Sequence, residues 1–260
     1  MPYLTHKHAI VTGGGRGIGA AIAAELARLG ASLTIMGRDV ASLERCAADL
    51  ASEHRVRVLP VVCDVGDEAS IDGAFARARD ALGEPFALVN NAGQAESAAL
   101  PEMQRALWDR MMSVNLTGSY LCARAVLPAM LAANTGRIIN IASTAGLRGY
   151  ARMTAYCAAK HGVIGLTRAL AQETARFGIT VNAVCPGYTE DTSMVRQAID
   201  TLMRNLNATE ADATEMMLRR NPRRAFVRPA EVANAVAWLC SPDATAVTGQ
   251  AIAVAAGEVM

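Results

Sequence analysis

The sequence predicts an α/β protein: a single doubly wound domain with a seven-stranded parallel sheet and a helical lid. Two observations lead to this prediction. Short runs of β-branched residues alternate with longer alanine-rich stretches along the chain, which is the pattern of a parallel sheet with helices on both faces. Runs such as Ala9-Ile10-Val11 are apolar without alternation, as expected of strands that are covered on both sides.

The expected elements follow one another in a regular order. Strands are predicted near His8–Thr12, Ser32–Met36, Val56–Cys63, Ala87–Asn90, Arg137–Ala142, Thr180–Cys185 and Ala251–Val254. Helices are predicted between them, near Ile18–Leu29, Val40–Glu53, Glu68–Leu82, Pro101–Leu131, Ala155–Phe177 and Pro229–Leu239. No linker, repeat or low-complexity tract interrupts this order, so we expect one domain that spans residues 1–260.

The longest interruption of the strand–helix order is the segment 188–221, which follows Pro186-Gly187 at the end of the sixth predicted strand. Connections of this length are commonly functional. Methionine and leucine residues recur in it at helical spacing, which favours short helices that cover something apolar. Because ligands bind at the carboxyl ends of parallel strands, we predict a lid. A purely structural helical hairpin is the alternative.

The composition excludes several classes of protein. With 52% hydrophobic residues, 19% charged residues and a net charge of +1, the chain has no global attraction to nucleic acid or to an anionic membrane. No window approaches the roughly 18 uninterrupted apolar residues of a membrane span, and no signal peptide is evident. The six cysteines and four histidines show no metal-ligand spacing. We therefore expect a reduced, cytoplasmic protein without a metal site.

A glycine-rich turn, Thr12-Gly13-Gly14-Gly15-Arg16-Gly17-Ile18-Gly19, separates the first predicted strand from the first predicted helix. Glycines let the backbone approach a phosphate, and a helix N-terminus offers unpaired N–H groups and positive potential. The spacing is GxxxGxG rather than the GxGxxG of the general dinucleotide fingerprint. The context predicts that this turn binds the phosphates of a dinucleotide, with a simple tight connection as the alternative.

The end of the second predicted strand bears on which dinucleotide binds. An acidic residue there would bind the ribose 2′-hydroxyl of NAD, but the strand ends in Gly37-Arg38. Together with Arg16, Arg38 would converge on the 2′-phosphate of NADP. Asp39 comes one residue late and is expected to cap the following helix. We predict a preference for NADP(H). NAD(H) is the alternative if both arginines are ordinary surface residues.

Three residues suited to proton transfer follow the fifth predicted strand. Ser143 ends the strand, and Tyr156 and Lys160 lie in the next helix, with the tyrosine 13 residues after the serine. Residues four apart share a helix face, so the ammonium group would lie beside the phenol. A nearby cation lowers a tyrosine pKa from its ordinary value of about 10 towards the working range. This spacing predicts an enzyme.

Two further polar features each have a structural and a functional interpretation. Asn90-Asn91-Ala92-Gly93 follows the fourth predicted strand, where it would either stabilise a turn or border the ligand crevice. Asn115 is a polar residue within an otherwise apolar helical stretch. It is either a buried amide with satisfied hydrogen bonds or part of the site.

These motifs resemble the short-chain dehydrogenase/reductase family across essentially the whole chain, and that family has a Rossmann-type fold. The resemblance implies that Tyr156 donates the proton in carbonyl reduction and that Ser143 hydrogen-bonds the substrate oxygen. Lys160 would hold the nicotinamide ribose and lower the pKa of the tyrosine. Asn115 would hold a water that links Lys160 to solvent.

The resemblance also assigns cofactor contacts. Asp64 would meet the adenine, Asn90 the adenosine-side ribose, and Thr189 the nicotinamide amide. The last assignment departs from the usual PGxxxT pattern, because Asp191 stands where the threonine is common. The full set of expected cofactor residues is Gly13, Gly15, Arg16, Gly17, Ile18, Gly19, Arg38, Asp64, Val65, Asn90, Ala92, Gly93, Tyr156, Lys160, Pro186, Gly187 and Thr189.

Two shorter segments, Cys185–Thr189 and Thr248–Gln250, resemble the bacterial 3-oxoacyl-thioester reductases. Asn134 and Phe177 replace two basic residues that dock an acyl carrier protein, which favours a 3-oxoacyl-CoA or a small ketone as substrate. Five arginines lie between residues 219 and 228. They would either meet the phosphates of coenzyme A or form a solvated helix end.

We therefore expect an NADPH-dependent oxidoreductase that reduces a ketone to a secondary alcohol. One alternative is an NAD-dependent dehydrogenase that oxidises a hydroxyacyl-CoA, a cyclic alcohol or a sugar. Another is a nucleotide-sensing regulator without chemistry, although the polar site residues are all present. The small residues of Ala155–Ala171 and the family's mode of subunit pairing predict a homotetramer.

Overall fold

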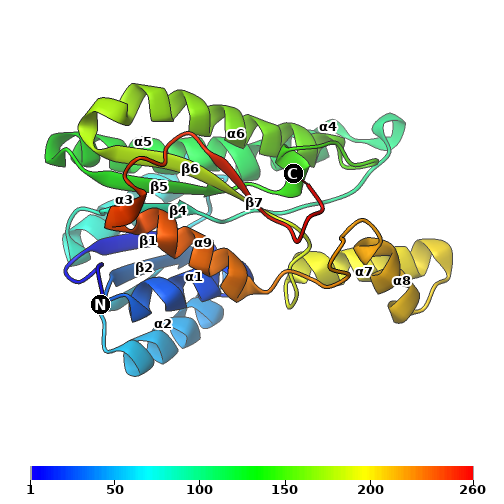
Figure 1. Cartoon of the computed structure of the whole chain (residues 1–260), viewed down its shortest axis with the longest axis horizontal. Helices are drawn as coiled ribbons and strands as arrows, with labels where there is room; N and C mark the ends of the chain where they lie inside the picture. The colour runs from blue at the N-terminus through cyan, green and yellow to red at the C-terminus, as the bar shows by residue number, and fades with distance from the viewer. Residues whose placement is uncertain (1, 260) are drawn as a thin grey trace.

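The computed structural model describes residues 2–259, apart from the side chain of Asn205. Seven parallel strands form one sheet in the order β3-β2-β1-β4-β5-β6-β7. The strands are β1 His8–Thr12, β2 Ser32–Gly37, β3 Val58–Val62, β4 Ala87–Asn90, β5 Gly136–Ile141, β6 Ile179–Pro186 and β7 Ala251–Val254. The order reverses between β1 and β4 (Figure 1), and a ligand crevice opens at such a point in doubly wound folds.

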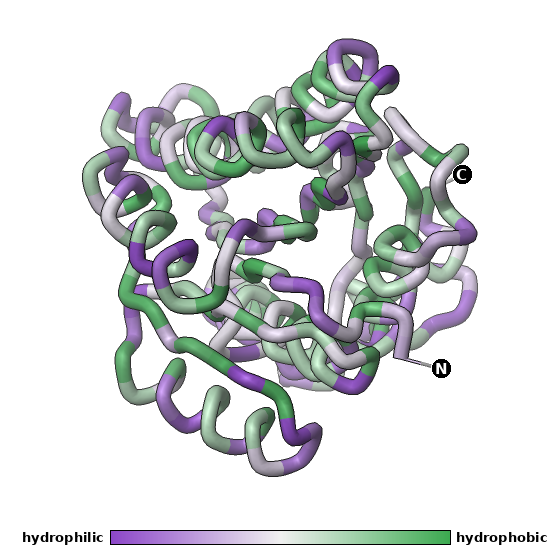
Figure 2. Tube along the Cα trace, turned by 90° about the vertical axis from the view of Figure 1, so that its left-hand side faces the viewer, coloured by the Kyte–Doolittle hydropathy of each residue, from purple (hydrophilic) through white to green (hydrophobic). Residues whose placement is uncertain are grey.

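Helices cover both faces of this sheet (Figure 1). They are α1 Gly17–Arg28, α2 Val40–His54, α3 Glu68–Leu82, α4 Arg105–Met112, α5 Gly118–Ala133, α6 Thr154–Thr174, α7 Ser193–Leu206, α8 Glu210–Leu218 and α9 Pro229–Cys240. One apolar cluster joins α1, α2 and α9 to one face of the sheet, and a second joins α3, α5 and α6 to the other. In Figure 2 the outer helices alternate between hydrophilic and hydrophobic colours, as amphipathic helices do.

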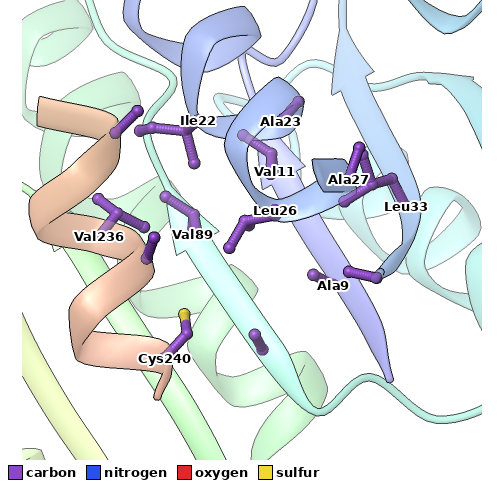
Figure 3. Close-up of a cluster of buried hydrophobic side chains, with 14 of the residues drawn as sticks. Ala9, Val11, Ile22, Ala23, Leu26, Ala27, Leu33, Val89, Val236 and Cys240 are labelled. Atoms are coloured by element: carbon purple, nitrogen blue, oxygen red, sulfur yellow. The ribbon is translucent and has the colours of Figure 1, made fainter. Parts of the chain in front are cut away.

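The first cluster shows why these sequences form helices at these places. Ile22 and Leu26 are one turn apart on α1 and have no exposed surface, so both face the sheet. Val236 and Cys240 have the same spacing on α9, and Figure 3 shows them directed at Val89 and at the side chains of α1. Apolar residues at this interval place one stripe of each helix in the core.

The predicted fold is confirmed, and the differences are local. The stretch Pro101–Leu131, expected as one helix, begins with a short 3₁₀ turn at Leu100–Glu102 and is then continuous from α4 to α5 through a π-helical turn, Ser113–Thr117. Val56 and Cys63 lie outside β3, which is shorter than expected. The extra residue of a π turn has no apolar-period signature, so the pattern did not reveal it.

The continuous helical segment Arg105–Ala133 is long and apolar enough to pass as a membrane span by length and composition alone, with a mean hydropathy of 1.3. The core helix of a soluble protein passes the same test. Leu121, Cys122, Val126 and Met130 of this segment are buried in the second cluster beneath the sheet. Packing inside the protein therefore accounts for part of the apolar character of this helix, since 39% of its most apolar window is buried.

The segment 188–221 forms α7 and α8, which Figure 1 shows as a pair set apart from the main layers. Its side chains build a small apolar cluster of their own from Val195, Ile199, Ala213 and Met217. Thr192 caps α7 by accepting a hydrogen bond from the Val195 N–H at 3.3 Å. The short helices expected in this segment are present as α7 and α8, and their role as a lid stays a prediction.

Candidate active site

A cleft of about 1160 Å³ opens at the carboxyl ends of the strands and continues below the α7–α8 pair. It brings together most of the residues that the sequence singled out. Those that line it are Gly13, Gly15, Arg16, Gly17, Ile18, Gly19, Arg38, Asp64, Val65, Ala92, Gly93, Ser143, Tyr156, Lys160, Pro186, Gly187 and Thr189. Asn90 and Asn115 are not among the lining residues.

The glycine turn is held tightly against the first strand and opens towards the cleft. A Cβ on Gly19 would lie 2.1 Å from the Gly13 carbonyl oxygen, so no side chain fits at this position. Gly13 and Gly17 have positive φ angles of 64° and 53°, a conformation that favours glycine. The atom nearest to a Cβ on Gly17 is a Thr192 methyl carbon at 3.6 Å. The turn therefore faces the start of α7 across the cleft.

The arginines expected at the adenosine end both line the cleft. Arg38 extends into solvent with 70% of its side chain exposed, and its Nη1 lies 3.8 Å from the Asp64 carboxylate. Asp39 accepts a hydrogen bond from the Ser42 N–H at 3.0 Å and caps α2, as predicted. That contact and the Arg16 guanidinium hold the pKa of Asp39 below its usual value. The rim at this end thus carries two cationic side chains.

Tyr156 and Lys160 lie on one face of α6 at the floor of the cleft. Only 6% of the tyrosine and 4% of the lysine is exposed. The lysine Nζ is 5.7 Å from the centre of the phenol ring and donates a hydrogen bond to the Ile141 carbonyl at 2.8 Å. Ser143 lies two residues after β5, which ends at Ile141, and its Oγ accepts a hydrogen bond from the Ala145 N–H at 3.1 Å.

The pKa shift of Tyr156 at the floor of the cleft differs in direction from the expectation. Burial raises the pKa of Tyr156 to about 12, with the nearby Ser143 hydroxyl opposing the rise. Burial lowers the pKa of Lys160 to about 8. The net shift of the tyrosine pKa is therefore opposite to the predicted lowering, because desolvation by burial is its largest cause. The phenol is held in its protonated form at neutral pH.

Asn115 lies in the π-helical turn and is 1% exposed. Its Nδ2 donates to the carbonyl oxygens of Gln94 and Met111 at 2.9 and 3.0 Å, and its Oδ1 accepts from the Gln94 N–H at 3.2 Å. A Cβ on Gly93 would lie 2.8 Å from this Oδ1 and 3.6 Å from the Lys160 Nζ. Asn115 therefore holds the loop after β4 next to Lys160. Its expected role in binding a water stays a prediction.

The expectation for the Asn90 side chain is corrected by the structure. Its Nδ2 donates to the Ser119 carbonyl at 3.2 Å and to the Asn140 Oδ1 at 2.9 Å, away from the cleft. Asn140 in turn donates to the Thr167 hydroxyl on α6. The side chain is buried inside the layers because alternate residues of a strand point to opposite faces. It joins β4 to α5 and β5, and Asn140 extends the link to α6.

The neighbouring residue, Asn91, is a contact that the sequence reasoning missed. It lines the cleft, and its Nδ2 donates to the carbonyl oxygens of Thr12 and Gly13 at 3.0 and 3.2 Å. It therefore holds the glycine turn in place. The paired asparagines were noticed in the sequence, but only the strand register shows which of the two reaches the turn.

The segment after β6 brings the predicted Thr189 and two residues that were not predicted, Thr192 and Met194, into the cleft. Thr189 is 3% exposed and donates to the Gly187 carbonyl at 3.1 Å. Its expected contact with the nicotinamide amide stays a prediction. Asp191 has a positive φ of 56°, and Thr192 after it lines the cleft together with Met194. The Met194 sulfur lies 3.9 Å from the Tyr156 hydroxyl, so α7 reaches the catalytic floor.

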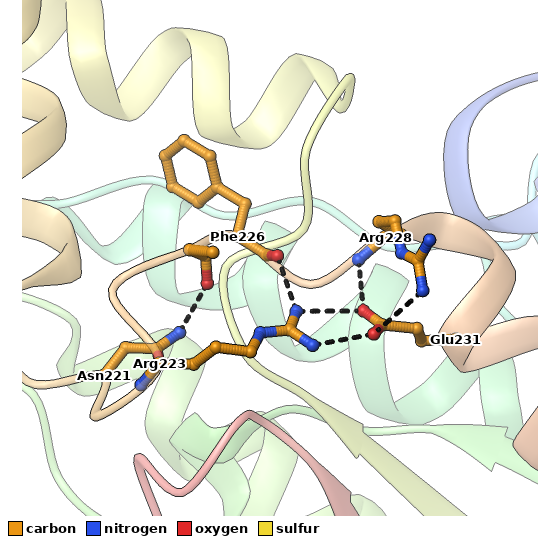
Figure 4. A network of polar contacts seen from close by, with 6 residues as sticks. Asn221, Arg223, Phe226, Arg228 and Glu231 are labelled. Carbon is orange, nitrogen blue, oxygen red and sulfur yellow. Dashed lines mark hydrogen bonds and ion pairs between the residues drawn. The ribbon is translucent and has the colours of Figure 1, made fainter.

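The arginines at 219–228 do not line this cleft. Arg223 donates to both carboxylate oxygens of Glu231 at 2.7 and 3.0 Å and to the Phe226 carbonyl at 2.8 Å (Figure 4). Arg228 lies 3.4 Å from the same carboxylate. These contacts hold the pKa of Glu231 down to about 2. Both arginines thus fasten the start of α9, which supports their structural interpretation.

Two other observations bear on the chemistry of the site. Among residues 2–259 no group of three or more histidine, cysteine, aspartate or glutamate side chains is placed to hold a metal ion. All six cysteines are free thiols, and five of them are buried.

Comparison with known proteins gives this geometry a family. Residues 7–202 match the family model described as short chain dehydrogenase. The chain superposes with a TM-score of 0.93 on a structure of an actinorhodin polyketide ketoreductase with NADPH, to which it is 38% identical over 97% of each chain.

Two curated bacterial relatives extend the comparison. One is 2-(S)-hydroxypropyl-CoM dehydrogenase 3 of Xanthobacter autotrophicus, which is 39% identical over 95% of this chain and 94% of the relative. The other is a (2S)-[(R)-hydroxy(phenyl)methyl]succinyl-CoA dehydrogenase subunit of Thauera aromatica, also 39% identical, over 98% of this chain and 97% of the relative. The chain is therefore an oxidoreductase that belongs to the short-chain dehydrogenase/reductase family.

Proposed function

We propose that the protein reduces a ketone to a secondary alcohol with NADPH, and that Tyr156 is the proton donor. The observation that carries this proposal is the floor of the cleft. Tyr156 is buried there with the Lys160 Nζ 5.7 Å from the centre of its ring, and a phenol that still carries its proton is the form that can give one to a developing alkoxide. Ser143 lies beside it and would hydrogen-bond the carbonyl oxygen, and Lys160 would hold the nicotinamide ribose.

The cleft fits the cofactor that this proposal requires. Gly13, Gly17 and Gly19 bring the backbone of the turn close to the cleft, and the N-terminus of α1 has no acidic residue in its first turn. A diphosphate is favourable at such a helix end. Arg16 and Arg38 at the rim match a 2′-phosphate. When bound, NADPH supplies the hydride that reaches the carbonyl carbon.

For the substrate we propose a 3-oxoacyl thioester such as a 3-oxoacyl-CoA, with a small ketone as the second candidate. Two relatives carry coenzyme M or coenzyme A in the names of their substrates. Apolar side chains of the α7–α8 pair, Met194, Leu202 and Met217, line the cleft and would cover an acyl chain. Because Arg223 and Arg228 are bound to Glu231, Arg204, which lines the cleft, is better placed to meet phosphates.

Steady-state kinetics with NADPH and NADH across acetoacetyl-CoA, ethyl acetoacetate and cyclohexanone test this proposal. We expect NADPH to be preferred and acetoacetyl-CoA to have the lowest KM. Added salt should narrow the gap between acetoacetyl-CoA and the ester by screening charges. Arg204→Glu should raise KM for the CoA substrate alone. Equal KM values that do not change with salt would point to a small free ketone, and no ketone turnover at all would overturn the function.

The alternative direction, oxidation of a secondary alcohol, uses the same residues. It needs a phenol that has lost its proton, so we expect oxidation to become faster as the pH rises towards the pKa of Tyr156, which burial raises. Rates measured in both directions between pH 6 and pH 10 would distinguish the two. Faster oxidation than reduction at pH 7 would favour the dehydrogenase.

We also propose that the enzyme works as a homotetramer in the cytoplasm. Gly165 is exposed on α6 and has no atom within 4 Å of an added Cβ, so another helix can approach closely there. The six free thiols are typical of a reducing compartment. A sedimentation mass near that of a single 27.3 kDa chain would contradict the tetramer.

A further inference from the structure

The chain after β7 returns to the cleft and ends beside the start of α6 (Figure 1). There the Tyr150 hydroxyl donates a hydrogen bond to the Glu258 Oε1 at 2.6 Å. The same hydroxyl lies 2.9 Å from the Thr144 Oγ1. Because a phenol has one proton to give, it donates to the carboxylate and accepts from Thr144. Thr144 directly follows Ser143, so a residue of the last strand's tail is linked to the floor of the site.

The second oxygen of Glu258 faces another wall of the cleft. A Cβ on Gly187 would lie 3.3 Å from Oε2, so this oxygen packs over the backbone at the start of the segment that leads to α7. The carboxylate is also near enough to Tyr188 to add to the rise in the pKa of that phenol, which burial causes first. Tyr150 and Tyr188 both line the cleft. The Glu258 carboxylate therefore lies close to both Tyr150 and Tyr188, two aromatic residues that line the cleft.

Contacts are made to the ring face of Tyr150 as well as to its hydroxyl. The Arg148 guanidinium lies 5.3 Å from the centre of its ring, a distance at which a cation is attracted to an aromatic face. Burial and the bond to Glu258 raise the pKa of Tyr150, which keeps the phenol protonated as a donor. Hydrogen bonds to a charged acceptor are about twice as strong as neutral ones.

We propose that Glu258 is a positioning residue that fixes Tyr150 as a wall of the cleft and thereby sets which ketones fit. This inference rests on the proposed ketone reduction. Glu258 touches neither Tyr156 nor the glycine turn, so its effect falls on the fit of the ketone. Its one contact with an expected cofactor residue is the packing of Oε2 on Gly187, whose N–H stays bonded to the Val254 carbonyl at 3.1 Å, so we expect binding of NADPH to be unchanged.

Four variants test the proposal: Glu258→Ala, Glu258→Gln, Tyr150→Phe and the double variant Glu258→Ala/Tyr150→Phe. KM and kcat are measured for acetoacetyl-CoA and cyclohexanone, and KM for NADPH. Glu258→Ala and Tyr150→Phe should each raise the ketone KM about tenfold, the value of one charge-assisted hydrogen bond, with the NADPH KM unchanged. Glu258→Gln should retain most of the wild-type KM, because an amide oxygen still accepts from the phenol. Glu84→Ala, an exposed carboxylate before β4, is the matched control.

The double variant decides whether the two residues act through one bond. Its ketone KM should equal that of either single variant. Additive effects, an unchanged ketone KM, or a parallel rise in the NADPH KM would overturn the proposal. If Glu258→Ala fails to fold, Tyr150→Phe keeps the ring and still gives the answer. A wild-type protein without ketone turnover would instead refute the proposed function, so the two failures are distinguishable.

Discussion

α6 and the α7–α8 pair contribute to the same cleft, and they are built in opposite ways. Tyr156, Lys160 and Val163 on α6 are at most 6% exposed, and the helix packs on β6 and on the turn after β5. In the pair, Leu206 and Met216 are 56% and 41% exposed. Its apolar contacts are made within a small cluster of its own.

This difference separates two requirements of an oxidoreductase. Proton transfer needs groups that are held within a fraction of an ångström, which packed helices provide. Admission of a substrate needs a cover that opens at a low cost in free energy. A segment that makes few buried contacts can open in this way. We therefore expect the chemistry on the packed side of the cleft, and we expect the thinly packed side to control the entry of substrate.

Tyr156→Phe tests the packed side, with the largest expected effect. The ring keeps its packing while the proton donor is lost, so kcat should fall roughly 100- to 10,000-fold with the affinity for NADPH retained. Stopped-flow turnover and fluorescence titration with NADPH measure the two quantities. Tyr120→Phe removes a hydroxyl from a tyrosine that is 45% exposed on α5 and should leave kcat unchanged. More than a tenth of the wild-type kcat in Tyr156→Phe would remove the phenol from its role.

The same truncation, isoleucine to alanine, in the packed body of the protein and in the α7–α8 pair sharpens the comparison. Ile22 on α1 has no exposed surface and Ile199 on α7 has 6%. Ile22→Ala should lower the free energy of unfolding by about 2–5 kcal/mol, measured by urea denaturation. Ile199→Ala should lower it by less than about 1 kcal/mol, because the pair can open without unfolding the body, and should raise the ketone KM. Equal losses of stability would show that the pair is an integral part of the core.

The sequence was sufficient for the layers of the fold. Strands such as Ala9-Ile10-Val11 are buried on both faces, and the alternation of strands and helices leaves few ways to arrange them. The stripe of Ile22 and Leu26 on α1 could be predicted from spacing alone. The π turn at Asn115 could not, because one inserted residue changes the aim of a helix without changing its composition.

The features of the site also divide into those that the sequence predicted and those that only the folded structure shows. Spacing alone predicted that Tyr156 and Lys160 share a helix face. The direction of the tyrosine pKa shift was missed, because its largest cause is burial, which only the packing of the folded chain determines. Glu258 was also out of reach, since it meets Tyr150 over 108 positions of sequence and only the course of the chain after β7 brings them together.

Burial of Lys160 gives the packed side an electrostatic cost that depends on pH. Its pKa falls from 10.5 to about 8, so between these values the unfolded chain binds more protons and stability rises with pH. Below pH 8 the cost is fully present. Lys160→Met should therefore gain stability over the wild type at pH 7, on the order of 2 kcal/mol, and the gain should shrink towards pH 10. Urea denaturation at pH 7, 8, 9 and 10 measures it.

The difference in the free energy of unfolding between the wild type and Lys160→Met isolates the contribution of Lys160. The raised pKa of Tyr156 acts above pH 10 with the opposite sign, but it is common to both and cancels. Arg204→Met on α7, where the side chain is exposed, should show no gain that depends on pH. A constant difference for Lys160→Met from pH 7 to 10 would mean that the ammonium group is better solvated than its burial indicates.

Arg38 extends the comparison to the exposed adenosine rim, where we expect the smallest effect. Its side chain is 70% exposed, so solvent screens its charge. Loss of one charge-assisted hydrogen bond costs about 1.5–3 kcal/mol, and exposure places Arg38 at the low end, near tenfold. In Arg38→Asp the carboxylate also repels a 2′-phosphate and accepts a hydrogen bond from a 2′-hydroxyl. The ratio of kcat/KM for NADPH over NADH should therefore fall at least tenfold.

The wild-type preference for NADPH should also narrow as ionic strength rises, since exposed charges act over a Debye length of about 10 Å at 0.1 M salt. Arg45→Asp makes the same charge change on the exposed face of α2 and should leave the cofactor ratio as it is. If Arg38→Asp left the ratio unchanged, Arg16 would be the main partner of the 2′-phosphate, and Arg16→Ala should then erase the preference. A wild-type enzyme that uses NADH better than NADPH would contradict the assignment of both arginines, because neither would then meet a phosphate at this rim.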